Sequence, residues 1–408
     1  MFANLVTLAL ALSVVANPMV VIRDSPINIP LMKRYHTVGD NRTLIMRDRE
    51  HITSLYKHRH GGLRATDITT SAYVVNVTVG NPPTEYTLLL DTGSSNTWVG
   101  ADLKKPFKPS STTVQTGQNV SFKYGSGEFS GTEVIDRLDL GNGLVVEKQG
   151  IGAASSSSGL RAGFDGILGV GPVDLTIGSL SPNTTTPIPT VTDNLFAQGT
   201  IPENLVAVSF EPSTSISDTN GVVTFGSVDS SRFTGDIHFT SRTQVQNSSL
   251  WWGIDQTLTY GQSTPILSQS TAGIVDTGTT LLLLNTDAFV TYQTATGAVL
   301  DDRTGLLQFT PEQYAALESL FFHINGVTFE FTANAQIFPR KFNALVGGDP
   351  DGIYGIVGDL GTPPPLVPVF NSAFVNGMAF LERFYSVYDT TNNRIGLATT
   401  KFTYADIN

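Results

Sequence analysis

The feature that most constrains this chain is an internal repeat in which an apolar strand runs into Asp-Thr-Gly. The segment YTLLLDTGSSN at 86–96 returns as GIVDTGTTLLLLN at 273–285, with the two aspartates 185 positions apart. A solenoid would repeat every 20–50 residues or so, whereas this spacing is about half the length of the chain beyond residue 65. We therefore expect two similar halves, each presenting one such turn.

The repeated turn also indicates a chemistry. A lone Asp-Thr-Gly is usually an ordinary turn, but two copies, each followed by two hydroxyl residues, are harder to explain that way. Glycine lets the backbone approach the carboxylate, and Ser94 and Thr279 are placed to bond its outer oxygen. If the halves bring the turns together, Asp91 and Asp276 share one proton, because two close carboxylates do not both ionise cheaply. Such a pair can activate water with one carboxylate and protonate a substrate with the other.

The rest of the chain beyond Thr66 predicts a mainly β fold. It contains 39 Gly and 21 Pro, and β-branched or alternating stretches are separated by turn residues. Strands are expected at 73–79, 86–92, 122–140, 222–226 and 327–333. Helices are expected at 191–199, 286–297 and 311–321, each behind a start signal.

Charge divides the chain near residue 65. Residues 17–65 hold nine Lys/Arg against four acids, together with four of the six histidines, and the rest holds fifteen Lys/Arg against thirty-one acids. A basic leader ahead of an acidic body suggests a propeptide held by ion pairs, which acid would weaken. A solvated basic tail without a regulatory role is the alternative. The net charge of −11 argues against nucleic acid as a partner.

The N-terminus resembles a secretory signal peptide over residues 1–16. Leu5–Ala16 is an apolar run of twelve, with Val14 and Ala16 as the small residues of a cleavage site. The run is shorter than the roughly 20 residues of a membrane span, and a buried strand or helix is the alternative. The absence of cysteine mildly favours a reducing compartment, but the leader favours secretion. No membrane anchor is expected.

Several further motifs make the chain resemble the pepsin-like aspartic proteases, especially the cysteine-free fungal polyporopepsin type. DTGSSNTW at 91–98 and DTGTT at 276–280 resemble the two active-site motifs, and YGSG at 124–127 lies where that family carries its flap tyrosine. FDGILG at 164–169 and FLERFYSVYD at 380–389 resemble conserved family segments. The resemblance covers about residues 70–405.

This resemblance implies a secreted aspartic endopeptidase, active in acid, with a bilobal pepsin-like aspartic protease fold. Two similar β-rich lobes, 70–238 and 239–408, would enclose a central substrate cleft. The implied catalytic residues are Asp91 and Asp276, supported by Thr92, Gly93, Ser94, Thr277, Gly278 and Thr279. Tyr124, Gly125 and Ser126 would form the flap, with Trp98 positioning the tyrosine, and Phe164 and Ile167 would line a substrate pocket. Taken alone, a tyrosine in a glycine-rich hairpin is more often structural, and a role as plain core is the alternative for Phe164 and Ile167.

The resemblance also implies partners and a precursor form. Residues 17–66 would be an inhibitory propeptide, with Lys33 or Arg34 against the catalytic carboxylates, and the mature chain would start between Arg64 and Ser71. The partners would be peptide and protein substrates and the chain's own propeptide, acting on a monomer. No cofactor or metal is expected, because His238 and His323 lie far apart without a ligand pattern.

One departure and five glycosylation motifs remain. Where the family usually carries Ile-Leu-Gly-Asp, this chain has VNGM at 375–378, so a pocket of the second lobe is expected to differ. Asn-x-Ser/Thr motifs begin at Asn41, Asn76, Asn119, Asn183 and Asn247, of which Asn183 and Asn247 are the favoured sites.

Two other classes of protein remain as alternatives to a protease. One is a glycosidase, which also uses two carboxylates, and the other is a non-catalytic peptide-binding protein of the same fold.

Overall fold

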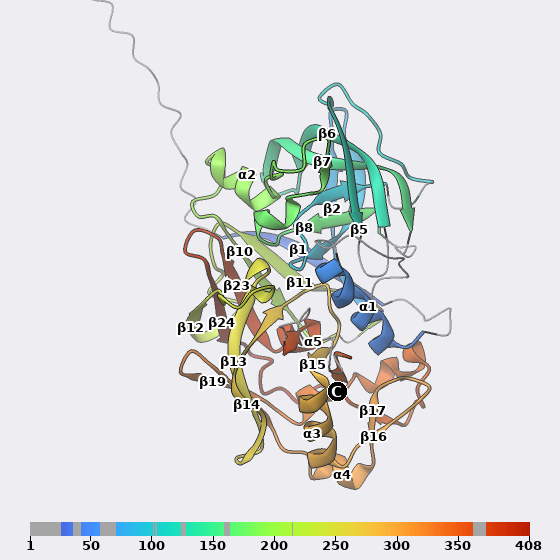
Figure 1. Ribbon diagram of the computed structural model, residues 1–408, viewed down its shortest axis with the longest axis vertical. Coiled ribbons are helices and arrows are strands. Elements are labelled where there is room, and N and C mark those ends of the chain that lie inside the picture. The colour runs from blue at the N-terminus through green and yellow to red at the C-terminus, as the bar shows by residue number, and fades with distance from the viewer. Residues whose placement is uncertain are drawn as a thin grey trace, which may run out of the picture.

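The computed structural model describes residues 26–35, 42–57, 71–100, 102, 104–123, 128–158, 164–213, 215–361 and 373–408. Figure 1 shows two halves along the longest axis, with β2 and β5–β8 in the upper half and α3, α4 and β13–β17 in the lower half. We call residues 71–199 the N-terminal half and residues 248–381 the C-terminal half. The expectation of a mainly β chain is confirmed.

Within the described residues, one sheet of fourteen strands runs through the molecule in the order β12-β24-β23-β10-β11-β1-β2-β3-β8-β4-β7-β6-β5-β9. The strands are β1 (Ile27–Tyr35), β2 (Ser71–Val79), β3 (Thr84–Asp91), β4 (Thr97–Val99), β5 (Val114–Lys123), β6 (Glu128–Asp139), β7 (Val145–Ser158), β8 (Gly166–Gly169), β9 (Leu180–Ser181), β10 (Leu205–Phe210), β11 (Ser217–Phe225), β12 (Thr234–Ser241), β23 (Phe384–Asp389) and β24 (Arg394–Thr399). Because β23 pairs with β10, the end of the chain returns to the sheet of the N-terminal half.

A second sheet belongs to the C-terminal half and has the order β19-β18-β13-β14-β22-β15-β21 across the described strands. Its strands are β13 (Gly253–Tyr260), β14 (Thr264–Val275), β15 (Leu282–Leu284), β18 (Leu320–Ile324), β19 (Val327–Phe331), β21 (Val357–Asp359) and β22 (Phe374–Asn376). A small third sheet contains β16 (Val299–Leu300), β17 (Leu307–Phe309) and β20 (Ile353–Tyr354).

The sequence repeat corresponds to a repeated strand arrangement. In the N-terminal half, β3 lies parallel to β8, with Asp91 opposite Gly169, and β4 crosses back antiparallel to β8. In the C-terminal half, β14 lies parallel to β22 and β15 runs antiparallel to β22. Each Asp-Thr-Gly turn therefore leaves the end of a buried strand that is fixed on both sides, which leaves the turn little freedom to move.

The helices are short and lie around these sheets. They are α1 (Leu44–Lys57), α2 (Val191–Ala197), α3 (Thr286–Thr296), α4 (Pro311–Ala315) and α5 (Met378–Leu381), with 3-10 turns η1 (Val173–Thr176), η2 (Ser248–Leu250), η3 (Asn334–Gln336) and η4 (Arg340–Val346). None of the described helices is long and apolar enough to span a membrane.

The helix expected over 311–321 is wrong in its second half. It ends at Ala315, and β18 begins at Leu320. Alternate residues of β18 are buried, with the partly exposed Phe321 lying between the buried Leu320 and Phe322, and the strand pairs on both sides, with β13 and β19. Pairing in the sheet therefore decides the conformation of a segment whose local composition suits a helix.

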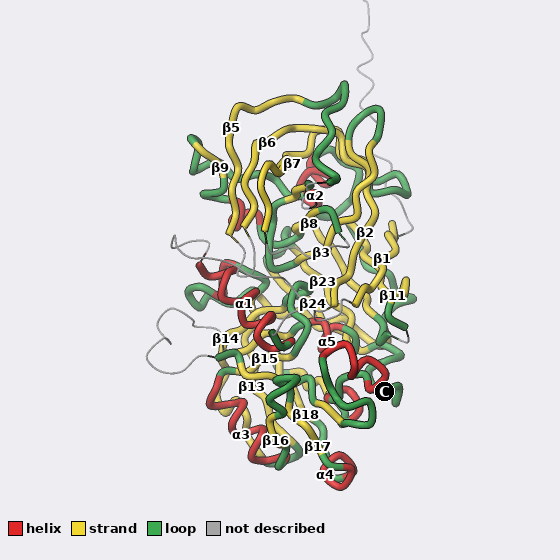
Figure 2. Tube along the Cα trace, turned by 90° about the vertical axis from the view of Figure 1, so that its right-hand side faces the viewer, coloured by secondary structure: helices red, strands yellow, loops and turns green. Residues whose placement is uncertain are grey.

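The leader forms one strand and one helix that the sequence analysis does not predict. Strand β1 is inserted between β11 and β2, and alternate side chains, Ile27, Ile29 and Leu31, are buried. Helix α1 lies between the two halves in Figure 1 and again in the turned view of Figure 2. The leader thus contributes to the sheet with one element and reaches the junction of the halves with the other.

Candidate active site

The structure brings the two repeated aspartates together at the junction of the halves. Asp91 ends β3 and Asp276 directly follows β14, and both are fully buried. One side-chain atom from each, together with a ring nitrogen of His51, lie within 4.8 Å of one another. Residues from three distant parts of the sequence therefore meet at one point.

The first turn holds its carboxylate with one backbone and one side-chain donor. The Gly93 N–H donates to Asp91 Oδ1 at 2.8 Å, and the Ser94 hydroxyl donates to Asp91 Oδ2 at 2.5 Å. A Cβ at position 93 would come within 2.6 Å of Asp276 Oδ1. Glycine is therefore required here by the closeness of the second carboxylate.

The second turn repeats this arrangement. The Gly278 N–H donates to Asp276 Oδ1 at 2.9 Å, and the Thr279 hydroxyl donates to Asp276 Oδ2 at 2.6 Å. A Cβ at position 278 would lie 2.7 Å from Asp91 Oδ1. The two carboxylates are thus oriented by equivalent donors from the two halves.

Thr92 and Thr277 link the turns to each other. The Thr92 N–H donates to Thr277 Oγ1 at 2.9 Å, and the Thr277 N–H donates to Thr92 Oγ1 at 2.9 Å. The Thr277 hydroxyl donates in turn to the Leu90 carbonyl at 3.1 Å. This reciprocal pair fixes the separation of the two aspartates without using their carboxylates.

The leader contributes His51 to this site. His51 Nε2 lies 3.0 Å from Asp276 Oδ2, and both side chains are buried. Burial lowers the pKa of His51, but the Asp276 charge and hydrogen bond, with smaller contributions from Asp91 and Asp48, raise it to about 9. The imidazole is therefore a cation over the carboxylates, and its protonated ring has no lone pair to offer a metal ion.

The two aspartates differ in their pKa shifts. Burial raises the pKa of Asp91, and the nearby Asp276 charge raises it further, to about 6. Burial also raises the pKa of Asp276, but the His51 charge together with the hydrogen bonds from His51, Thr279 and Gly278 outweighs that effect and leaves the pKa below its usual value. With the leader in place, Asp276 is the more acidic member of the pair.

Helix α1 is fixed to the C-terminal half by two further carboxylate contacts. The buried Asp48 carboxylate accepts from the Leu281 N–H at 2.7 Å and from the Thr280 N–H at 3.1 and 3.2 Å. Arg49 Nη2 pairs with Asp359 Oδ2 at 2.7 Å. Burial raises the pKa of Asp48 to about 6 despite these donors. The helix therefore occupies two backbone donors immediately after the second turn.

The expectation that Lys33 or Arg34 faces the aspartates is wrong. Lys33 is buried against the Glu382 carboxylate, which raises the lysine's pKa although burial alone would lower it. The Arg34 Nε–H points to Met32 Sδ at 3.4 Å. Both residues lie on β1, along the sheet, and within the described part of the leader it is His51 of α1 that contacts an aspartate. The cluster of histidines was the available signal for His51.

The remaining expected site residues divide into two groups. Tyr124, Gly125 and Ser126 lie outside the described residues. Trp98, Phe164 and Ile167 are buried in one cluster with Phe129, whose ring centroid is 4.5 Å from that of Trp98. With the leader in place these three side chains form part of a packed core.

The glycosylation motifs differ in exposure. Asn183 is exposed, and its amide donates to Thr186 Oγ1 at 2.7 Å. Asn247 is half-buried, with a φ of 78°. Asn76 and Asn119 are exposed on strands, and Asn41 lies outside the described residues.

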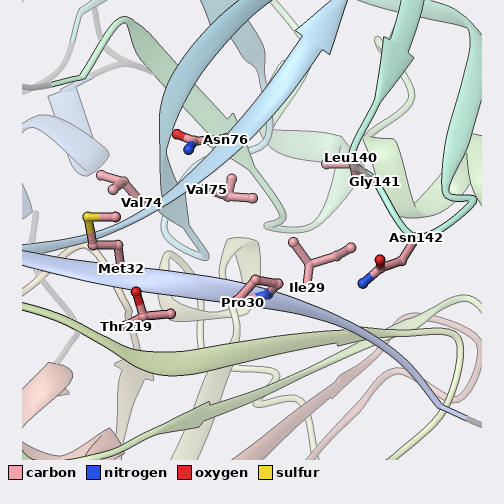
Figure 3. Close-up of a pocket in the computed structure, with 10 residues that line it drawn as sticks. All are labelled: Ile29, Pro30, Met32, Val74, Val75, Asn76, Leu140, Gly141, Asn142 and Thr219. Atoms are coloured by element: carbon pink, nitrogen blue, oxygen red, sulfur yellow. The ribbon is translucent and has the colours of Figure 1, made fainter.

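A separate hollow lies along the leader strand, away from the aspartates. Figure 3 shows it between β1 and β2, with a volume of about 290 Å³. Ile29, Pro30 and Met32 come from β1, whereas Val74 and Asn76 come from β2. The hollow depends on β1, so it belongs to the form of the protein that retains its leader.

Comparisons with known proteins agree with this geometry. The profile of the family described as "Eukaryotic aspartyl protease" matches residues 72–400. Polyporopepsin of Irpex lacteus is 61% identical over 336 residues, 82% of this chain and 96% of the relative. Human gastricsin is 32% identical over 363 residues, 84% of this chain and 86% of the relative. The crystal structure of an aspartic proteinase from Irpex lacteus matches with a TM-score of 0.80 and 54% identity, covering 94% of this chain and 100% of the other.

Proposed function

The chain belongs to the eukaryotic aspartyl protease family and is a pepsin-like aspartic endopeptidase, and on that premise we propose that Asp91 and Asp276 are its catalytic pair, in an enzyme secreted as an inactive precursor. The observation that carries the proposal is the equivalent orientation of the two buried carboxylates by Gly93, Ser94, Gly278 and Thr279.

The proposed reaction uses one proton shared by the pair over a bound water. The ionised carboxylate takes a proton from the water as the water oxygen attacks the peptide carbonyl carbon. At the same time the protonated carboxyl donates its proton to the carbonyl oxygen. The resulting tetrahedral diol collapses when a carboxyl proton passes to the peptide nitrogen and the C–N bond breaks, while the other, ionised carboxylate takes a proton from a diol hydroxyl; this leaves a carboxylic acid and an amine and restores the single proton of the pair. The Ser94 and Thr279 hydroxyls, donating to the outer oxygens, hold each carboxylate in position.

The leader is proposed to inhibit by occupying the same groups. His51 contacts Asp276 at the position that the attacking water and the scissile peptide would occupy. The Asp48 carboxylate accepts hydrogen bonds from the Thr280 and Leu281 N–H groups. Because the pKa of Asp276 is lowered by the contact with His51, the stability from that contact is present above the ordinary pKa of about 4 and is lost as pH falls. Acid therefore weakens the inhibitory contact between His51 and Asp276 by protonating Asp276.

The organisation of the precursor follows from this proposal. Residues 1–16 would be a signal peptide, removed on secretion, and residues 17–66 the propeptide. The start of the mature chain, between Arg64 and Ser71, lies mostly outside the described residues. The mature enzyme is proposed to be a monomer of two lobes, 70–238 and 239–408, with glycans at Asn183 and Asn247. The boundary at residue 238 falls within β12.

The proposed substrates are extended peptides with bulky apolar residues around the cleaved bond. Phe164 and Ile167 would line the pocket before that bond, after the cluster around Trp98 opens on departure of the leader. Tyr124, Gly125 and Ser126 would close over the substrate from the tip of the β5–β6 hairpin. The pairing of β5 with β6 runs from Val114 opposite Ile135 to Lys123 opposite Glu128.

The experiment is cleavage of a denatured protein at acid pH by the purified chain and by Asp91→Asn and Asp276→Asn. Each variant should lose cleavage, and pepstatin, a transition-state mimic, should block the wild type. Asp236→Asn, at an exposed position on β12, is the control and should cleave normally. Retained cleavage in either dyad variant would overturn the assignment of that aspartate.

A further inference from the structure

Two adjacent buried tryptophans connect the C-terminal half to the backbone around Asp91. Trp251 and Trp252 directly precede β13. The Trp251 indole N–H donates to the Gly93 carbonyl at 3.0 Å, and the Trp252 indole N–H donates to the Val170 carbonyl at 3.2 Å. Both acceptors belong to the N-terminal half, so two side-chain donors cross between the halves at this point.

The same dipeptide is bonded to the strand that carries the second aspartate. The Val275 N–H donates to the Trp252 carbonyl at 3.0 Å, and Asp276 is the next residue. The Trp251 N–H donates back to the Ser248 carbonyl at 3.2 Å, closing the η2 turn. The two tryptophans are therefore bonded to their own η2 turn and to both of the segments that carry the aspartates.

The two residues that accept the indole bonds, Gly93 and Val170, each also donate a backbone hydrogen bond to Asp91. Gly93 accepts the Trp251 bond through its carbonyl and donates its N–H to Asp91 Oδ1. Val170 accepts the Trp252 bond and donates its N–H to the Asp91 main-chain carbonyl at 2.8 Å. Glycine has more backbone freedom than any other residue, so a fixed bond to its carbonyl restricts the orientation of the N–H that holds Asp91.

We infer that Trp251 and Trp252 are positioning residues that hold Asp91 in register with Asp276 through Gly93 and Val170; the inference rests on the proposed role of the two aspartates. It differs from the Thr92–Thr277 pair, which ties the two turns directly. Trp251 instead restrains the carbonyl of Gly93, the residue whose N–H donates to the carboxylate of Asp91, and Trp252 restrains the carbonyl of Val170, whose N–H donates to the Asp91 main-chain carbonyl. Small displacements of a reacting group reduce turnover steeply, by about 10²-fold for 1 Å.

A purely structural role is the competing explanation, because a buried indole N–H usually finds an acceptor. The two roles differ in what they require. Packing requires the shape of the ring, whereas positioning requires the donor. A variant that keeps the ring system and removes the N–H separates them.

The test replaces Trp251 with Phe and, in a second protein, with benzothienylalanine, which has nearly the indole shape but carries sulfur in place of N–H. Full-length chains are acidified, active sites are counted by titration with pepstatin, and kcat and KM are measured per active site. Both replacements should lower kcat roughly tenfold with KM nearly unchanged. The limb of the kcat/KM profile that Asp91 governs should move to higher pH, because a loosened Gly93 N–H stabilises ionised Asp91 less.

Two companion variants make the outcome decisive. Tyr385→Phe removes another buried side-chain hydrogen bond, from the Asp229 N–H, in a core cluster separate from the one that contains the two tryptophans; it should reduce stability and leave kcat unchanged. Wild-type kcat and an unmoved pH profile with benzothienylalanine at position 251 would overturn the inference, even if Trp251→Phe does not fold. Asp91→Asn in the same assay tests the dyad separately, since its retained activity would refute the dyad rather than the tryptophan contacts.

Discussion

His51 Nε2 lies 3.0 Å from Asp276 Oδ2, with both groups withdrawn from solvent. A residue of the leader therefore forms an ion pair with one of the two aspartates that the sequence repeat brings together. The contact makes the stability of the full-length chain depend on the protonation of a single imidazole.

The first prediction concerns the alkaline side of that dependence. Because the pKa of His51 is raised from 6.5 to about 9, its contribution is complete below pH 6.5 and is lost as pH rises through 9. The loss amounts to about 3 kcal/mol. Urea unfolding of the full-length chain across this window should show the loss, and His51→Gln should lack it. His238→Gln, at an exposed site, should behave like the wild type; equal profiles for all three proteins would refute the prediction.

A second prediction concerns Asp48. Asp48→Ala leaves the Thr280 and Leu281 N–H groups without their acceptor, which should weaken docking of α1 by about 1–3 kcal/mol. The full-length chain should then gain peptidase activity faster after acidification. Since the pKa of Asp48 is raised to about 6, its protonation favours the docked leader as pH falls, so Asp48 does not drive acid release. Glu50→Ala, which removes a half-exposed pair with Arg42, is the control; no difference between the two variants would count against the contact.

The third prediction separates the precursor from the mature enzyme. Lys33→Met leaves Glu382 buried beside an apolar side chain, which should destabilise the full-length chain by about 3–5 kcal/mol. The proposed mature enzyme lacks residue 33, so kcat after activation should be unchanged. Lys401→Met, at an exposed lysine, should alter stability by less than about 0.5 kcal/mol. A Lys33→Met precursor as stable as the wild type would show that the ion pair contributes little.

A fourth prediction tests the closeness of the carboxylates. Gly93→Ala would place a Cβ 2.6 Å from Asp276 Oδ1, forcing the turns apart, and should reduce kcat by about 10²-fold or more. Gly235→Ala adds a Cβ in open space at a φ of 68°. That control should cost about 1 kcal/mol of stability and leave kcat intact. Near-normal turnover by Gly93→Ala would mean that the two carboxylates lie farther apart than described.

The local parts of the site could be predicted from the sequence because they follow from short motifs. The apolar strand before each Asp-Thr-Gly predicts β3 and β14, and the residue two or three positions after the aspartate supplies each donor. A short sequence window is sufficient for such contacts. The structure reproduces both turns with the same bonds.

The contacts made by the leader could not be predicted in this way. Lys33 and Glu382 are 349 positions apart, and His51 and Asp276 are 225 apart. Which basic group reaches the aspartates depends on where β1 ends and α1 begins, and that depends on pairing with β2 and β11. The helix expected through residue 321 fails for a related reason, since sheet pairing of β18 overrides local preference.

The most direct test of the central claim is the turnover number of Asp91→Asn, Asp276→Asn and the double variant, measured on one peptide at one acid pH. If the two aspartates act as a unit, each single change should reduce kcat at least about a thousandfold, and the double change should reduce it little further. Losses that multiply in the double variant, or a single variant within about tenfold of the wild type, would contradict the account.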